Sequence, residues 1–120
     1  MIEHTMTPEN FVKKIRQSVL DENTVIYRDL FEMTEVEQAS DLYWKEALAL
    51  FNKLSNEDKE TLFKIMRQIS VDTISNFFAV LDGVNCLEDQ EGDFSLKLDN
   101  KPEKLNGDLQ DIFLEIEENL

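Results

Sequence analysis

Pairs of carboxylates three residues apart are the feature of this sequence that lies closest to chemistry. The pairs are Glu32 and Glu35, Glu57 and Glu60, and Asp108 and Asp111. Residues at this spacing share one face of a helix, so two pairs on facing helices are able to hold a magnesium ion between them. The spacing therefore suggests a metal-dependent hydrolase that uses paired carboxylates.

This layout resembles that of all-helical nucleotide pyrophosphatases, which present Glu-x-x-Glu and Glu-x-x-Asp from adjacent helices. The sequence departs from their pattern in two ways. Glu57 and Glu60 begin an expected helix, where the helix dipole alone favours acids, and no basic cluster that would take a triphosphate lies beside them. With 26 acids among 120 residues, such spacings also arise by chance. The all-helical hydrolase is therefore kept as the alternative hypothesis.

Other groups that carry catalysis or bind cofactors are scarce. The one histidine, His4, precedes the first expected helix, and the chain has no second histidine for a catalytic pair. The acidic stretch 89–93 does not fit a calcium-binding EF-hand, because Leu87 and Leu98 fall where that loop requires acids. We expect no metal ligand, no cofactor and no catalytic residue, and these absences argue against an enzyme.

The cysteine content and the hydropathy pattern indicate where the protein resides. Cys86 is the single cysteine, so no disulfide forms within the chain, as is usual for proteins of the reducing cytoplasm. No run of about 18 apolar residues is present, which is the length that a membrane span requires. We therefore expect a cytoplasmic protein without a membrane partner.

The charge of the chain is strongly negative, at −14. Residues 21–42 hold seven acids and one basic residue, and residues 86–120 hold eleven acids and three basic residues, whereas residues 43–85 are nearly balanced at six against five. Charge of this sign repels nucleic-acid phosphates and anionic lipid, so we expect neither as a direct partner. Solubility is one interpretation of these acids. The other is a surface for a basic protein.

We interpret the chain as a non-catalytic protein-interaction module that covers a basic partner. The analogy, one of charge and size, is with immunity proteins, antitoxins and nucleic-acid mimics. The first candidate surface consists of Glu32, Glu35, Glu37 and Asp41. The second candidate surface consists of Glu88, Asp89, Glu91 and Asp93.

A structural or homodimeric subunit is a further alternative, suggested by residues 42–51. This stretch is apolar nearly all round, so one side of its helix is available to cover a second chain. Trp44 lies on its apolar stripe and is expected in the core. Tyr43, next along the chain, points elsewhere and is expected to reach the surface.

The elements that must position these residues are predicted to be helices. Three glycines and two prolines provide few of the turns that a β-sandwich or barrel needs. Apolar residues at helical spacing predict helices at about 8–20, 25–33, 34–54, 55–81 with a bend at 70–73, and 107–120. Alternation at Phe94, Leu96 and Leu98 predicts a small β-hairpin at about 94–106 before the C-terminal helix. The predicted fold of the single domain 1–120 is mainly α, a compact bundle of four or five helices with that hairpin.

Overall fold

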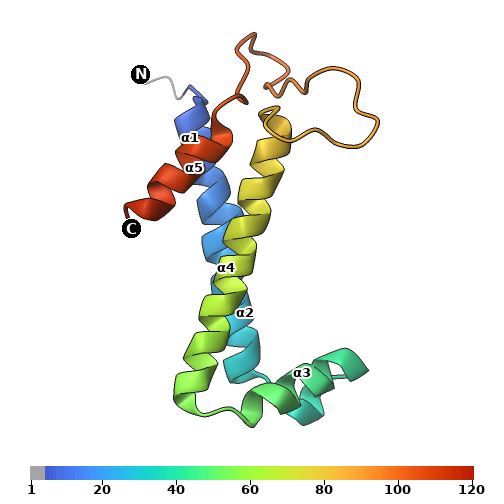
Figure 1. The fold of residues 1–120 in the computed structure, drawn as a ribbon. Helices are drawn as coiled ribbons and strands as arrows, with labels where there is room; N and C mark the ends of the chain where they lie inside the picture. Colours follow the sequence, from blue (N-terminus) through green and yellow to red (C-terminus); the bar gives the residue numbers. More distant parts are fainter. Residues whose placement is uncertain (1–4) are drawn as a thin grey trace.

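The computed structural model describes residues 5–120, and all the regular secondary structure in this range is helical (Figure 1). The mainly α prediction is confirmed. The elements are α1 (Pro8–Ile15), the π-helical η1 (Arg16–Asp21), α2 (Glu22–Met33), the 3-10 helix η2 (Val36–Gln38), α3 (Leu42–Asn52), α4 (Asn56–Leu81) and α5 (Leu109–Glu118).

Side-chain caps fix where the helices begin. The Thr7 hydroxyl accepts a hydrogen bond from the Asn10 amide at 3.1 Å, and Pro8 occupies the first turn of α1. The Ser55 hydroxyl accepts one from the Asp58 amide at 3.1 Å and begins α4. Both starts were predicted, because hydroxyl caps are local features of the sequence.

Two predicted boundaries were wrong. The gap between the helices predicted at 8–20 and 25–33 is itself helical, because the wider π-helical turn of η1 joins α1 to α2 without a break. The third helix begins at Leu42, not at residue 34, because Asp41 caps it there. At residues 70–73, where a bend was predicted, α4 continues without a break. The hydroxyls of Ser70 and Thr73 donate back to carbonyls within the helix, at 3.1 and 2.7 Å.

The helices form an open arrangement (Figure 1). The continuous helix of α1, η1 and α2 runs alongside α4, α5 packs on α1 and α4 at one end, and α3 projects sideways at the other end. The radius of gyration is 18.5 Å, whereas a compact domain of this length has about 13.6 Å. The helical bundle is thus present but is not compact, because α3 turns away from it.

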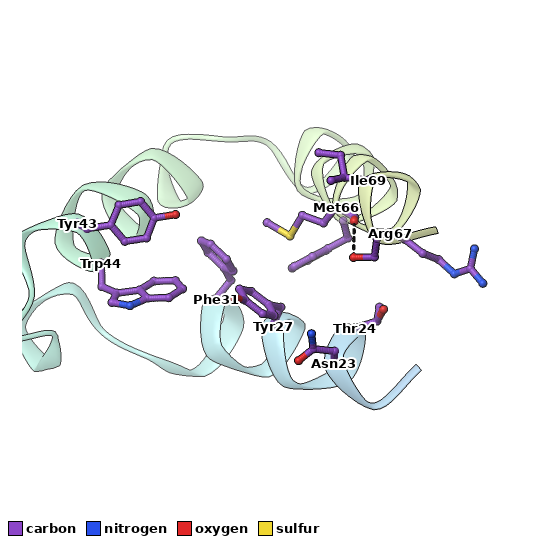
Figure 2. A pocket seen from close by; sticks show the side chains of 11 residues that line it. Asn23, Thr24, Tyr27, Phe31, Tyr43, Trp44, Met66, Arg67 and Ile69 are labelled. Atoms are coloured by element: carbon purple, nitrogen blue, oxygen red, sulfur yellow. Dashed lines mark hydrogen bonds between the residues drawn. The ribbon is translucent and has the colours of Figure 1, made fainter. Parts of the chain in front are cut away.

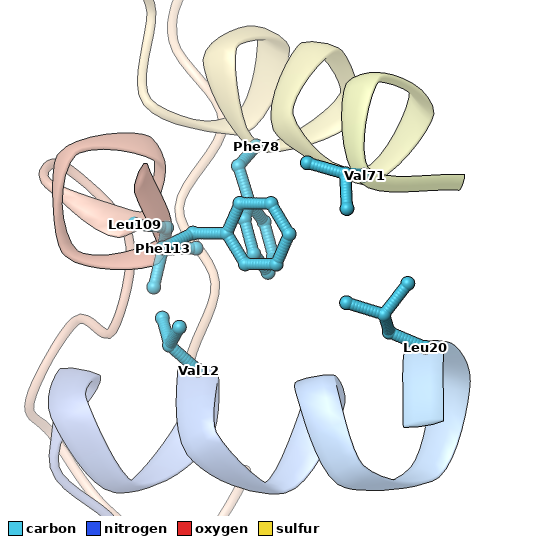
Figure 3. Close-up of a cluster of buried hydrophobic side chains, with 6 residues drawn as sticks. All are labelled: Val12, Leu20, Val71, Phe78, Leu109 and Phe113. Carbon is cyan, nitrogen blue, oxygen red and sulfur yellow. The ribbon is translucent and has the colours of Figure 1, made fainter. Parts of the chain in front are cut away.

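Two separate hydrophobic clusters hold the helices together. The upper cluster joins α1, η1, α4 and α5 (Figure 3), and its buried members are Val12, Leu20, Val71, Phe78, Leu109 and Phe113. The lower cluster joins α2, α3 and α4, and its buried members are Phe31, Leu48, Phe51 and Phe63. The chain therefore has a core at each end.

An ion cluster fixes the C-terminal end of α5 to both long helices. Glu117 accepts hydrogen bonds from Arg16 and from both terminal nitrogens of Arg67, the latter at 3.0 and 3.1 Å. Burial acts to raise the pKa of Glu117, but the hydrogen bonds from Arg67 and Arg16 outweigh it and lower that pKa below its usual value.

The β-hairpin predicted at about 94–106 is not seen. The chain does double back there, but between the two arms the backbone bond is Leu105 N–H to the Leu96 carbonyl, at 2.7 Å. The buried Asn106 side chain takes the place of a ladder. It accepts from the Leu96 amide at 2.7 Å and donates to the carbonyls of Phe94, at 2.8 Å, and Leu81. Because one side chain satisfies these backbone groups, the segment stays irregular.

Candidate interaction surface

A pocket lies in the inner corner where α3 leaves the bundle (Figure 2). We call it the corner pocket, and its volume is about 460 Å³. It is lined by Asn23, Thr24, Tyr27 and Phe31 of α2, Tyr43 and Trp44 of α3, and Phe63, Met66, Arg67, Ile69 and Ser70 of α4. Arg67 is the charged residue of this lining, which otherwise consists of aromatic, aliphatic and small polar side chains.

Trp44 is the centre of an aromatic group at the mouth of the corner pocket (Figure 2). Its ring centroid lies 5.2 Å from that of Tyr43, 6.0 Å from that of Phe31 and 6.2 Å from that of Tyr27. Trp44 packs against the lower cluster, in agreement with its predicted place in the core. It is only half-buried, however, because it also lines the corner pocket. Such aromatic groups often dominate the binding energy of protein interfaces.

The rim of the corner pocket exposes large apolar side chains. Tyr43 is 65% exposed, Ile69 61% and Tyr27 42%. The exposure of Tyr43 was predicted. The exposure of Tyr27 and Ile69 was not predicted. Ile69 belongs to an apolar stripe at helical spacing, and such a stripe favours burial.

The first predicted acidic group lies along the connection from α2 to α3. We call these residues the foot acids, and Glu32, Glu35, Glu37 and Asp41 are all exposed. Asp41 also has a structural role, because its carboxylate accepts a hydrogen bond from the Tyr43 amide at 2.8 Å and so caps α3. The structure therefore brings this predicted group together at one end of the molecule.

A hollow of about 230 Å³ lies between Asp41, one of the foot acids, and Trp44 of the aromatic group. It is lined by Leu30, Thr34, Gln38, Ala39, Ser40, Asp41, Trp44 and Leu48. Trp44 lines both this hollow and the corner pocket. We call it the foot hollow. An apolar floor beside exposed acids suits a segment that carries both apolar and basic side chains.

The second predicted acidic group lies at the other end of the molecule. We call Glu88, Asp89, Glu91 and Asp93 the loop acids; all are exposed in the irregular connection between α4 and α5. Figure 1 shows this connection at the end of α4 away from α3. The foot acids and loop acids therefore do not form one continuous face.

The paired carboxylates do not gather around a cation site. Glu32 of α2 and Glu60 of α4 do face each other, but the guanidinium of Arg28 lies between them, with distances of 3.2 Å to Glu32 and 2.8 Å to Glu60. The Arg28 hydrogen bond lowers the pKa of Glu60. Within residues 5–120, no three metal-ligating side chains gather at one point. Asp108 and Asp111 stand at the start of α5, toward the opposite end.

The remaining residues with potential chemistry do not add to a site. Cys86 is an exposed free thiol in the connection after α4, and His4 lies outside the described residues. In the part of the chain that the structure describes, no helix has the length and apolarity to cross a membrane.

No protein-family model matches this chain, and no curated protein or solved structure matches it either.

Proposed function

We propose that this protein is a non-catalytic interaction module that binds a basic protein at the foot acids and the foot hollow. The observation that carries this proposal is the position of Trp44 and Leu48 in a hollow bordered by Asp41. The cytoplasmic location expected from the single cysteine is part of the same proposal.

The two parts of this surface have different roles. Exposed acids accelerate the encounter with a positively charged partner and disfavour acidic competitors. They add little affinity individually, because exposed ion pairs contribute about 0.2–1 kcal/mol each. The hollow supplies the anchor, because an apolar side chain that fills it removes part of Trp44 from water. The expected partner segment therefore has an apolar residue flanked by lysine or arginine.

Trp44 makes this proposal directly testable, because it is the only tryptophan of the chain. The probe is a short synthetic peptide in which lysine and leucine alternate, titrated at fixed protein concentration while Trp44 fluorescence is followed. We expect a saturable change that weakens as salt is added, because salt screens the foot acids. A peptide of the same length with glutamate in place of each lysine serves as the control.

Two matched variants locate the binding surface. The foot variant carries E32Q, E35Q, E37Q and D41N, and the asparagine keeps the cap of α3. The loop variant carries E88Q, D89N, E91Q and D93N, and each variant changes the net charge from −14 to −10, since −14 + 4 = −10.

We expect the foot variant to weaken the lysine peptide about tenfold, because four rim charges at roughly 0.35 kcal/mol sum to about 1.4 kcal/mol. The loop variant is expected to retain wild-type affinity. Equal weakening by both variants would show a general charge effect and would contradict this assignment, as would equal binding of the glutamate peptide.

A further inference from the structure

The end of α4 meets the start of α5 at a pair of residues with their own chemistry, Asn106-Gly107. It is the one Asn-Gly pair of the sequence. Asparagine followed by glycine is prone to spontaneous deamidation, because glycine has no side chain to keep its backbone nitrogen away from the asparagine side chain. Asn106 is nevertheless buried, with 6% of its surface exposed. A chemically labile pair therefore lies inside the structure.

The polar atoms of the Asn106 side chain are held by hydrogen bonds. Its Oδ1 accepts from the Leu96 amide at 2.7 Å, and its Nδ2 donates to the carbonyls of Phe94, at 2.8 Å, and Leu81. These partners come from the end of α4 and from the irregular connection that follows it (Figure 1). Asn106 therefore joins α4, the connection and the start of α5. We call this meeting point the junction.

The backbone nitrogen that attacks in deamidation is engaged as well. The Gly107 amide donates to one carboxylate oxygen of Asp82 at 2.7 Å, and the Gln110 amide donates to the other at 2.8 Å. A hydrogen bond to a carboxylate stabilises the proton on the amide, whereas the attack needs the nitrogen without its proton. Both reacting groups are thus bound to other partners in the folded chain.

We propose that Asn106 is a deamidation site that the folded chain protects, and that its deamidation releases α5. The Gly107 nitrogen forms a bond to Cγ of Asn106, the Cγ–Nδ2 bond breaks, and ammonia leaves with the proton of the Gly107 amide. Water then opens the resulting succinimide ring at either of its two carbonyls and gives aspartate or isoaspartate. Water is the only co-reactant. This inference goes beyond the proposed function, because the junction lies at the end of α4 away from α3 and the foot hollow.

Neither product can restore the junction. Aspartate has no amide hydrogens for the two carbonyls to which Asn106 donates, and its carboxylate would face them without a proton to share. It also brings a second negative charge close to Asp82, which binds the next residue, Gly107. Isoaspartate adds one carbon atom to the backbone directly before α5. Each product therefore weakens the attachment of α5, which supplies two buried members of the upper cluster.

The first experiment compares deamidation in the folded and the unfolded chain. The full chain is kept in mildly alkaline buffer, with and without guanidinium chloride, and peptide mass spectrometry follows conversion at Asn106. We expect conversion without denaturant to be on the order of 100-fold slower, because the folded chain reacts only while the junction is locally open. Equal rates in the two conditions would overturn the inference.

A substitution at Asp82 tests the protection itself. D82A removes the acceptor of the Gly107 amide, so we expect Asn106 to deamidate on the order of 10-fold faster than in the wild-type chain. Circular dichroism checks that the variant is folded. The control is D99A, which removes an exposed acid of the same connection and should leave the rate unchanged. Slower conversion in D82A would show that Asp82 acts as a base for the attack, and this result would contradict protection.

N106D carries the aspartate product from the start and tests the release of α5. We expect its melting temperature to be about 10 °C below that of the wild-type chain, and its α5 amides to exchange faster with solvent. N100D is the matched control, because it adds the same charge at an exposed position of the same connection. It should melt within about 2 °C of the wild-type chain. If N106D matches N100D in melting temperature and in α5 exchange, deamidation does not release α5 and the inference is wrong. The lysine peptide reports on the foot hollow alone, so that failure is distinguishable from failure of the proposed function.

Discussion

Replacing Glu117 by glutamine tests the ion cluster that holds α5 on the two long helices. Arg16 is only 8% exposed, and its Nε has no hydrogen-bond partner, so its charge is balanced mainly by Glu117. E117Q preserves the size of the side chain and one accepting oxygen, but it removes the negative charge. The substitution therefore leaves a buried guanidinium without its counter-ion.

The expected cost follows from the burial of the three groups. Removing one partner of a fully buried pair costs about 3–5 kcal/mol. Here the side chain of Glu117 is 13% exposed and that of Arg67 is 36% exposed, so solvent compensates part of the loss and about 2.5 kcal/mol is expected at neutral pH. For 120 residues the unfolding entropy is about 0.25 kcal/mol per kelvin. The melting temperature should therefore fall by about 10 °C.

The pH dependence gives a second check with a defined sign. The pKa of Glu117 is lowered in the folded chain from its usual 4.5. The stability that the ionised carboxylate provides is therefore complete above pH 4.5 and is lost as the pH falls through the folded-state pKa. The difference in melting temperature between wild type and E117Q should be full at pH 7 and should shrink below pH 4.5.

The assay is thermal unfolding followed by circular dichroism, at one protein concentration because association changes the apparent stability. E118Q is the matched control, since Glu118 is the next residue of α5 and is exposed. It should change the melting temperature by no more than about 2 °C, the equivalent of 0.5 kcal/mol. Equal effects of E117Q and E118Q, or a difference between E117Q and wild type that persists unchanged at pH 3, would refute this account of the cluster.

Two further predictions concern the irregular segment and α3. N106A leaves the backbone groups of Leu96, Phe94 and Leu81 without their side-chain partner, so chemical denaturation should show a loss of about 2–3 kcal/mol. Loss of less than 0.5 kcal/mol would show that this segment does not depend on Asn106. The amides of α3 should exchange with solvent faster than those of central α4, because only the lower cluster holds α3. Equal protection of α3 and α4 would contradict a weakly attached α3.

The parts of the fold that sequence analysis predicted correctly depend on local chemistry. The helices predicted near 8–20, 55–81 and 107–120 are present, and the caps and apolar stripes that form them involve residues within a few turns of one another. The same local logic failed at residues 94–106. Alternation of apolar residues there is real, but the Asn106 side chain competes for the backbone groups that a strand would use.

The candidate site was harder to predict, because it depends on where α3 goes. The pattern identified the foot acids as a group and Tyr43 as a surface residue. It did not reveal that Trp44 would border two hollows, since helical periodicity reports only that a residue faces other apolar groups. Glu32 and Glu60 do face each other, which is the arrangement that a metal site of paired carboxylates needs. Arg28 lies between them, however, and the spacing of the acids alone does not reveal it.

The negative charge and the open apolar corner are best understood together. An exposed apolar surface near Ile69 and Leu50 would draw many chains into nonspecific contact, but a charge of −14 repels other acidic proteins at long range. A basic partner of the kind we propose is attracted instead, because its charge is opposite in sign. Salt screens this attraction, so the proposed capture of a basic partner is expected to weaken as the ionic strength rises.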